Sequence, residues 1–379
     1  MNIKAASRIS RLALLLVPGL AAVPASAQQK QAPITGDIIV RQEWTDNIFT
    51  TPDPVPAHRT RFQIRPRFEV ETNSLRMILG ADASYSTDNN VEPDTGVTLP
   101  LNLIRDNYDS RSIRLDLASL GVNLSPAIKL DAGRLAMPFR LTNMVWDQDL
   151  RIQGGALQWT LYQGKTAEPI AKVSGIYSRG SHVFGDSKDP KGSSLGDGVT
   201  IKGGSLDLGF GSSKRFDFSG TYMQFDNIGY LEKMIRRQNT RVDGLLTREY
   251  QVIDVVLRFR IDAPLPIQIV VDGAQNHKAP DQKNGFWATL VLGSLKETRF
   301  RGEYTYAKVD KDVTVAAYAG DDFFWGTGWL GHRAEIAFAQ SPKSTFHIIG
   351  TMSQFKDSPN LLERDNWVKR LRLEARRTF

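Results

Sequence analysis

Residues 60–86 read TRFQIRPRFEVETNSLRMILGADASYS, and the alternation within this stretch decides the fold. Before the Asn73-Ser74 pair, apolar side chains at every second position alternate with charged ones, from Arg61 to Glu71. After the pair the alternation resumes from Leu75 to Tyr85. Successive side chains of a β-strand point to opposite faces, so each half presents one apolar and one polar face. The stretch predicts two antiparallel strands joined by a tight turn.

The same alternation recurs along the rest of the chain, and it predicts an all-β protein. Typical segments lie around Val255, Tyr304 and Leu371, where apolar residues again alternate with charged ones. We predict sixteen strands, at 36–46, 60–72, 75–86, 111–123, 126–135, 153–162, 168–179, 198–210, 214–226, 248–262, 265–276, 285–295, 298–310, 328–340, 343–355 and 367–379. The Gly203-Gly204 pair is read as a bulge, because the parity of the apolar positions changes there.

The segments between the predicted strands alternate between short and long. Short ones include Ala263-Pro264 and Ser341-Pro342, and long ones include 87–110, 136–152, 180–197, 227–247 and 311–327. Short turns at one rim and long loops at the other are typical of a transmembrane antiparallel β-barrel in an outer membrane, with periplasmic turns and extracellular loops. The strands of a soluble β-sandwich would also alternate apolar and polar residues, but its short and long connections would not lie at opposite ends. We therefore expect residues 28–379 to form a single barrel.

The aromatic residues on the predicted apolar faces favour the membrane barrel over the sandwich. Tyrosine and tryptophan residues gather at strand ends next to long loops, and phenylalanines gather at the opposite ends. The first group is Trp44, Tyr85, Tyr177, Tyr222, Tyr306 and Trp367, and the second is Phe210, Phe216, Phe300, Phe346 and Phe379. Two such levels predict the aromatic girdles of a lipid-facing belt.

The first 27 residues have the composition of a cleaved signal peptide. Lys4, Arg8 and Arg11 precede an apolar run over 12–23, and a small-residue cleavage site follows at 25–27. Twelve apolar residues are too few to span about 30 Å of hydrocarbon, so a membrane anchor is disfavoured. Cleavage before Gln28 removes three positive charges, and the formal net charge of +7 becomes +4. About eight residues then precede the first strand, which disfavours a transporter with an N-terminal plug.

Composition and motifs exclude several classes of function. The chain has 41% hydrophobic and 23% charged residues, which excludes a bundle of membrane helices and a disordered chain. It has no cysteine, its five histidines show no metal-ligand spacing, and no nucleophile or phosphate-binding motif is present. Basic residues are numerous but form no patch, so a nucleic-acid partner is not expected. We predict no catalytic residues, no cofactor and no metal, and hence no enzyme.

The last predicted strand resembles the C-terminal signature of outer-membrane barrels. Leu371, Leu373 and Ala375 alternate with charged residues, and an aromatic residue, Phe379, follows. Arg377 occupies a position that is usually apolar in that signature. The resemblance implies that the barrel-assembly machinery is a partner of this strand.

A second resemblance is carried by residues 133–155, GRLAMPFRLTNMVWDQDLRIQGG. Gly133-Arg134, Pro138-Phe139 and the run from Trp146 to Leu150 resemble a pattern of a family of bacterial outer-membrane porins. Membership would imply a general-porin-like channel for small solutes, whose third loop folds into the lumen and narrows it. On this analogy Arg140, Asp147, Asp149 and Arg151 would line the constriction. Alternatively, the two aspartates bond to loop amides and fix the shape of the loop.

The predicted inner wall carries further candidates for the pore lining. Three arginine clusters stand out, at Arg61, Arg65 and Arg67, at Arg258 and Arg260, and at Arg299 and Arg301. Many such residues form ion pairs across strands and serve only to keep the inner wall polar and rigid. Unpaired clusters would instead act on the charge of a passing solute. The near balance of inward acids and bases predicts at most a weak preference for anions.

Together these patterns predict an outer-membrane porin, a passive diffusion channel for small hydrophilic solutes. The alternatives are a substrate-specific outer-membrane transporter or a barrel enzyme, and after them an adhesin or structural barrel. Membrane lipids and lipopolysaccharide are expected at the outer surface. The porin resemblance also implies a homotrimer, although no interface motif in the sequence indicates one.

Overall fold

The computed structural model describes residues 34–48, 55–87, 111–163, 169–180, 199–210, 215–228, 239–242, 245–246, 249–320, 326–355 and 364–379. Residues Ile34–Phe379 form one compact unit. The predicted signal peptide, residues 1–27, lies outside the described residues. Across the described segments, no helix is both long and apolar enough to cross a membrane.

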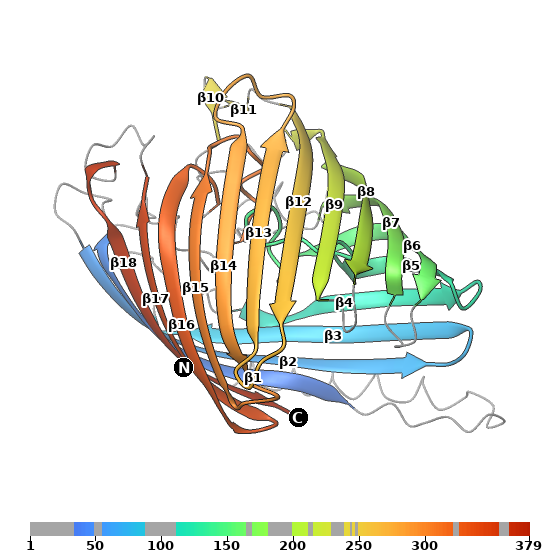
Figure 1. The fold of residues 1–379 in the computed structure, drawn as a ribbon, viewed down its shortest axis with the longest axis horizontal. Helices are drawn as coiled ribbons and strands as arrows, with labels where there is room; N and C mark the ends of the chain where they lie inside the picture. Colours follow the sequence, from blue (N-terminus) through green and yellow to red (C-terminus); the bar gives the residue numbers. More distant parts are fainter. Residues whose placement is uncertain are drawn as a thin grey trace, which may run out of the picture. The chain divides into compact units, whose positions relative to one another are not determined.

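Sixteen strands close into one antiparallel barrel, in which β1 pairs with β18 and every other strand pairs with its neighbours along the chain (Figure 1). They are β1 (Thr35–Ile48), β2 (Val55–Glu71), β3 (Leu75–Ser86), β4 (Arg111–Asn123), β5 (Ile128–Ala136), β6 (Arg151–Gln163), β7 (Pro169–Gly180), β8 (Thr200–Phe210), β9 (Phe216–Asp226), β12 (Tyr250–Ile261), β13 (Ile267–Asn276), β14 (Asn284–Ser294), β15 (Phe300–Val309), β16 (Trp329–Ser341), β17 (Ser344–Gln354) and β18 (Val368–Thr378).

This architecture confirms the predicted β-barrel and its sixteen strands. A small hairpin, β10 (Arg241–Val242) with β11 (Leu245–Leu246), was not predicted; it lies in the connection between β9 and β12. The expected bulge at Gly203-Gly204 is wrong, because β8 keeps an unbroken register through both glycines with β7 and with β9. The change in apolar parity there reflects buried Ile201 facing inward, where the lumen is apolar.

The two faces of the barrel wall differ in chemistry as the alternation requires. On β1, Val40 and Trp44 face outward and are 42% and 37% exposed, whereas Arg41 and Glu43 face inward and are buried. Apolar side chains that point outward are stable against lipid, and charged ones that point inward pair with each other or meet water. The barrel wall is therefore apolar on its outer face and charged on its inner face, the reverse of a soluble protein.

Aromatic residues lie on the outer face at two levels. Near the short connections, the rings of Phe210 and Phe216 are 5.5 Å apart and those of Phe300 and Phe338 are also 5.5 Å apart. At the other end, Trp44 stacks on His58 at 5.1 Å. Such paired rings at the two ends of the strands correspond to the girdles that bound a lipid-facing band.

The strand bounds separate two rims. The connections at one rim are short: 72–74, 124–127, 164–168, 211–215, 262–266, 295–299 and 342–343. Those at the other rim run from 49–54 up to 87–110 in length. We call these the short rim and the long rim.

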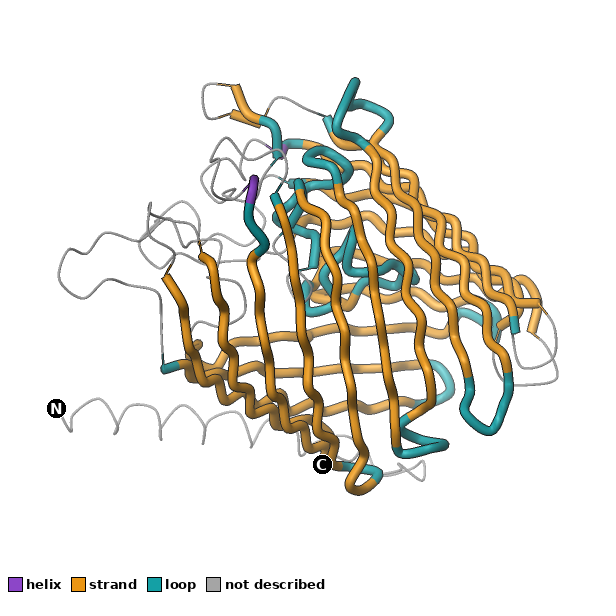
Figure 2. The backbone as a smooth tube through the Cα atoms, turned by 60° about the vertical axis from the view of Figure 1, so that its left-hand side comes forward, coloured by secondary structure: helices purple, strands orange, loops and turns teal. Residues whose placement is uncertain are grey.

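Two of the long-rim connections fold back inside the barrel, where Figure 2 shows loop segments enclosed by the strands. We call residues 137–150, between β5 and β6, the inner loop, and residues 310–320, which follow β15, the brace loop. Both contribute to one buried cluster with inward side chains of the wall, including Ile152, Met223 and Val252. The barrel therefore has a packed core on one side of its interior.

Candidate functional site

The inner loop is held in shape by its own short-range hydrogen bonds. The carbonyl of Thr142 accepts bonds from the amides of Val145 and Trp146, both at 3.2 Å. The Asp147 carboxylate accepts the amide of Asp149 at 2.9 Å, in the two-residue geometry that aspartate favours in turns. The loop is thus a preformed element rather than a slack connection.

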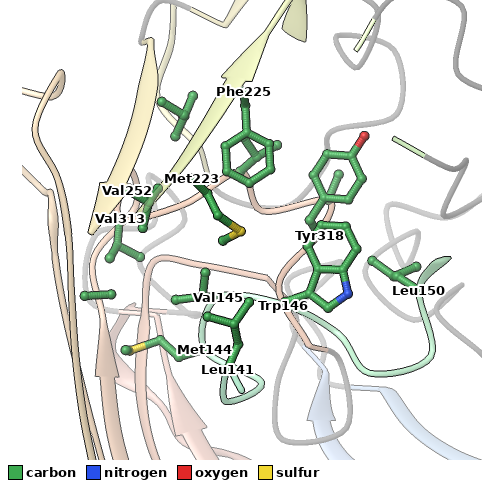
Figure 3. Packing of buried hydrophobic residues seen from close by; sticks show 14 of the residues in the cluster. Leu141, Met144, Val145, Trp146, Leu150, Met223, Phe225, Val252, Val313 and Tyr318 are labelled. Carbon is green, nitrogen blue, oxygen red and sulfur yellow. The ribbon is translucent and has the colours of Figure 1, made fainter. Parts of the chain in front are cut away.

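One face of the inner loop is apolar and dry. Figure 3 shows Leu141, Met144, Val145 and Trp146 in one group of buried side chains that also includes wall residues such as Met223. Met144 is 1% exposed and Val145 is fully buried. Gly285 on β14 leaves the space that Met144 fills, since a Cβ there would lie 2.6 Å from the Met144 sulfur. This apolar face seats the loop against the inner wall.

The brace loop covers the inner loop from the other side. The ring of Tyr318 stacks on Trp146 at 5.3 Å with an interplanar angle of 3°, and it also lies 5.6 Å from Phe225 on β9. The Asp147 amide donates to the Tyr318 carbonyl at 2.7 Å, and the Gly320 amide donates to the Asn143 carbonyl at 2.7 Å. Burial raises the pKa of the Tyr318 phenol, which therefore stays neutral.

Polar contacts tie the inner loop to the wall at β9, β12 and β13. Arg140 forms an ion pair with Asp217 at 3.2 Å, and the Arg140 carbonyl accepts a bond from Arg258 at 2.9 Å. The Thr142 hydroxyl donates to the Asp272 carboxyl. These three strands hold the first half of the loop.

The second half of the loop reaches the opposite wall at β1 and β2. Asp149 forms an ion pair with Arg65 at 2.9 Å, and Arg65 also binds Asp37 at 2.6 Å. Next to it on the wall, Arg114 on β4 pairs with Asp82 on β3 at 2.8 Å. A polar pocket is lined by Gln63, Arg65, Asp82, Arg114, Asp116, Asp149 and Arg151. The inner loop therefore crosses the lumen between two charged walls.

The predicted loop residues differ in how much water they meet. The side chains of Arg140 and Asp149 are about one-third exposed, at 35% and 36%. Asp147 is 5% exposed and Arg151 is 9% exposed, with Arg151 bonded to Asp116 on β4 and to the carbonyls of Gln148 and Leu150. Arg140 and Asp149 are thus partly accessible to water, whereas Asp147 and Arg151, the first residue of β6, are nearly buried.

The predicted wall arginines are also spread over different environments. Arg61 is 3% exposed on β2, and Arg67 pairs with Glu69 at 2.7 Å. Arg301 on β15 lies between Glu303 and Glu335. Arg260 pairs with Asp262 and Glu297 at the short rim, and its hydrogen bond lowers the pKa of Asp262 below the usual value.

Arg299 was expected on the inner wall beside Arg301, and that placement is wrong. The residue lies in the short-rim turn before β15, is exposed, and has a left-handed φ of 57°. Its carbonyl accepts the amide of Ala339 from β16. The turn at 295–299 has five residues, whereas the predicted strand bounds left only 296–297 between the strands, so the strand begins at Phe300.

Sequence reasoning missed a buried charge cluster on the inner wall around Glu43. This glutamate is fully buried and lies 2.5 Å from Arg59 and 3.6 Å from Arg370, and it also pairs with Arg372. Arg59 comes from β2, the next strand along the chain, whereas Arg370 and Arg372 come from β18, which reaches β1 only because the barrel closes. The alternation marked each residue as inward, but no local signal joined strands from the two ends of the chain.

Over the part of the chain that the structure describes, no group of three His, Asp or Glu residues could hold a metal ion. The clusters that the fold brings together are arginine–carboxylate pairs, which hold each other and leave partly exposed guanidinium and carboxylate groups toward water. Such an arrangement can set the size and charge of a passage.

Comparisons with known proteins agree with the fold. The family described as "Putative porin" matches residues 34–194. The barrel is similar to OprB of Pseudomonas putida, with a TM-score of 0.59 and 10% identity over 92% of this chain and 94% of that one. It is also similar to an engineered triple mutant of Rhodopseudomonas blastica porin, with a TM-score of 0.51 and 7% identity over 92% and 99% of the two chains. No curated protein matches the sequence.

These likenesses are too low in identity to show more than the fold, whereas the family match is one of sequence. It covers β1 to β7 together with the whole inner loop, which includes the residues that carried the resemblance in the sequence. The chain is a closed sixteen-stranded barrel with the fold of the porins, and its residues 34–194 match the porin family.

Proposed function

We propose that this chain is an outer-membrane porin through which small hydrophilic solutes diffuse passively past a constriction made by the inner loop. The family match and the barrel fold indicate an outer-membrane channel rather than an enzyme. The observation that carries the proposal is the path of the inner loop, which binds Asp217 on β9 at one end and Arg65 on β2 at the other. A sixteen-stranded barrel is wide enough to enclose an aqueous channel wherever side chains do not fill its interior.

The passage lies on the polar side of the inner loop. The other face of the loop packs into the buried cluster, so we place the passage beside β1 to β4, where the lining is polar. There the side chains of Arg65, Arg114 and Asp149 are 24%, 35% and 36% exposed. We assign these three and Arg140 to the constriction, because partly hydrated charges at a narrow point set which solutes pass.

Asp147 and Arg151 have a different role in this proposal. Both are nearly buried, and both bond to groups at the base of the loop. They position the inner loop, which is the alternative reading that the sequence left open for Asp147. Asp149 remains in the constriction because its carboxylate bonds to Arg65 from across the lumen.

We propose a weak preference for anions. Most charges at the constriction are paired, which leaves little net charge there. Arg59, Arg370 and Arg372 converge on Glu43, and we take the field on that side of the lumen to be positive. Reversal potentials in a salt gradient should shift modestly toward the anion potential; strong cation selectivity would contradict the assignment.

The remaining partners follow from the membrane location. We propose that residues 1–27 are cleaved on export, that the long rim is extracellular, and that lipid and lipopolysaccharide surround the aromatic levels of the outer face. We propose that the assembly machinery reads strand β18 with Phe379, whose amide donates to the Gly36 carbonyl at 3.1 Å. A homotrimer is proposed from the porin resemblance and is testable by cross-linking in native membranes.

Planar-bilayer recordings of the refolded barrel test the proposal. Stepwise openings with ohmic conductance are expected, and their absence from protein of verified β-structure would overturn the porin function. Arg140→Ala and Asp149→Ala should change conductance or selectivity because they remove partly exposed charges from the passage. Arg260→Ala is the matched control, since Arg260 pairs at the short rim. If all three variants behave as the unmodified chain, the inner loop is not the constriction.

A further inference from the structure

Two carboxyl groups lie behind the inner loop with no solvent around them. Asp254 on β12 and Asp272 on β13 are both 0% exposed. Asp254 lies opposite Ala274 and Asp272 lies opposite Val256, so the two are diagonal neighbours on the inward face. Both Asp254 oxygens and Asp272 Oδ1 are buried with no hydrogen-bond donor among the described residues, and the two carboxyl groups lie close enough to bond to each other once one of them carries a proton.

One cation lies near the pair, but it forms no ion pair with either carboxyl group. On β9, Thr221 lies opposite Asp254, and on β14 Trp287 lies opposite Asp272. On β12 the nearest cation is Arg258, which is one inward position beyond Val256 and donates to the Arg140 carbonyl of the inner loop. Arg140 itself pairs with Asp217 of β9. Among the described residues, no ion pair joins either Asp254 or Asp272 to a cation.

Two ionised carboxylates in contact at such a site would be strongly unfavourable. Each would lose hydration without a paired cation, and like charges within hydrogen-bonding distance repel. Neither ion has a donor to offer the other, whereas one proton between them supplies that donor. A divalent cation would need more oxygen ligands than this pair provides, and no described group of three acidic or histidine side chains could hold one.

We propose that Asp254 and Asp272 hold one proton between them, and that this proton locks the inner loop to the wall through Thr142. The inference rests on the proposed role of the inner loop as the constriction. Thr142 is the link because its hydroxyl donates to Asp272 while its carbonyl accepts the amides of Val145 and Trp146. The same residue thus joins the carboxyl pair to the turn that seats the loop.

The direction of the pH effect follows from proton linkage. The docked loop keeps the pair dry, so the docked state binds the proton more tightly than a state in which water reaches the carboxyls. The inner loop is therefore docked most firmly at low pH, and its docking weakens at higher pH because the pair loses the proton. With one proton involved, the ratio of undocked to docked loop rises by at most about tenfold per pH unit.

Single-channel recordings between about pH 4 and about pH 10 test this. In the unmodified chain, visits to a second conductance level should become more frequent as pH rises. Asp254→Asn should abolish the dependence and keep the loop docked, because the amide supplies a permanent donor. Asp207→Asn is the matched control: Asp207 is a buried inner-wall carboxylate on β8 that pairs with Lys172. An unchanged pH profile in Asp254→Asn would overturn the proposal.

Infrared difference spectroscopy of the unmodified chain gives a readout that needs no variant to fold. A protonated carboxyl stretch that disappears at high pH, and that is missing from Asp254→Asn, is expected. In Thr142→Val the band should persist while visits to the second conductance level become more frequent at every pH, since only the hydrogen bond from the loop to Asp272 is lost. The shared proton would be refuted if no protonated carboxyl band appeared at any pH. It would also be refuted if added calcium, rather than pH, set how often the second conductance level is visited. Absence of channel openings altogether would instead refute the proposed function.

Discussion

Replacing Tyr318 with alanine should release the inner loop while leaving the barrel intact. Tyr318 is 1% exposed and belongs to the brace loop, outside every strand. Its ring stacks on Trp146 of the inner loop and packs near Phe225 of the wall. The substitution therefore removes the side chain that clamps one in-folded loop against the other.

The magnitude follows from the burial. Truncating a fully buried aromatic side chain to alanine costs about 3–5 kcal/mol, including the cavity that remains. The Tyr318 carbonyl still accepts the Asp147 amide after the substitution, so part of the docking survives. If about 3 kcal/mol of the loss falls on docking, the undocked fraction of the inner loop rises about a hundredfold, because each 1.4 kcal/mol is a factor of ten.

Single-channel recordings measure this directly, as excess noise and visits to a larger conductance in Tyr318→Ala. Tyr304→Ala is the control, since Tyr304 faces outward on β15 and is 49% exposed. Both variants should keep the far-ultraviolet spectrum of the barrel. Equally quiet channels in both variants would show that the brace loop does not hold the inner loop, and the reasoning from the Trp146–Tyr318 stack would fail.

Three further substitutions test separate parts of the account. Gly320→Ala should also loosen the inner loop, because a Cβ there would lie 2.5 Å from the Asn143 side chain and 2.9 Å from the Asn143 carbonyl oxygen. Gly302→Ala on the outer face is the control: its Cβ would make only ordinary contacts, and the variant should give the same recordings as the unmodified chain. Glu43→Gln should destabilise the barrel by about 3–5 kcal/mol in denaturant unfolding, because it removes the buried negative charge that three arginines share; an unchanged unfolding midpoint would contradict this. Arg114→Ala should move the reversal potential toward cations, and a shift toward anions would remove Arg114 from the passage.

The fold could be read from the sequence because alternation is a local property. The alternation of neighbouring residues indicates the two faces of each strand, as in the run from Leu75 to Tyr85. Short turns such as the one at 72–74 then fix the register between strands. Ends of strands were less certain: Arg299 was placed on a strand because its spacing fits, although the turn before β15 requires a left-handed residue there.

The site was harder to predict, because it depends on contacts between distant segments. The resemblance around Trp146 singled out the inner loop, but nothing local showed which side of that loop is dry. The brace loop did carry a signal: residues 313–320 read VTVAAYAG, an apolar run in a connection that was expected to be exposed. Apolar residues in a long loop indicate burial, and here they pack against the inner loop.

The buried charge groups show the same limit. Asp254 and Asp272 each alternate correctly with apolar neighbours, so the sequence marked them only as inward residues on a polar wall. Their isolation from water and from cations arises when the inner loop covers them, which depends on the folding of residues 137–150 across β12 and β13. Position on a face is a local property, whereas burial beneath a loop is a tertiary one.

The most direct test of the central claim is to block the passage at Asp149. The chain contains no cysteine, so Asp149→Cys introduces a single thiol. If the inner loop narrows an aqueous pore, a bulky membrane-impermeant thiol reagent should lower the single-channel conductance of this variant, whereas Lys343→Cys at the short rim should be unaffected. Efficient labelling of the introduced thiol with no change in conductance would contradict the account, because solute would then pass without meeting the loop.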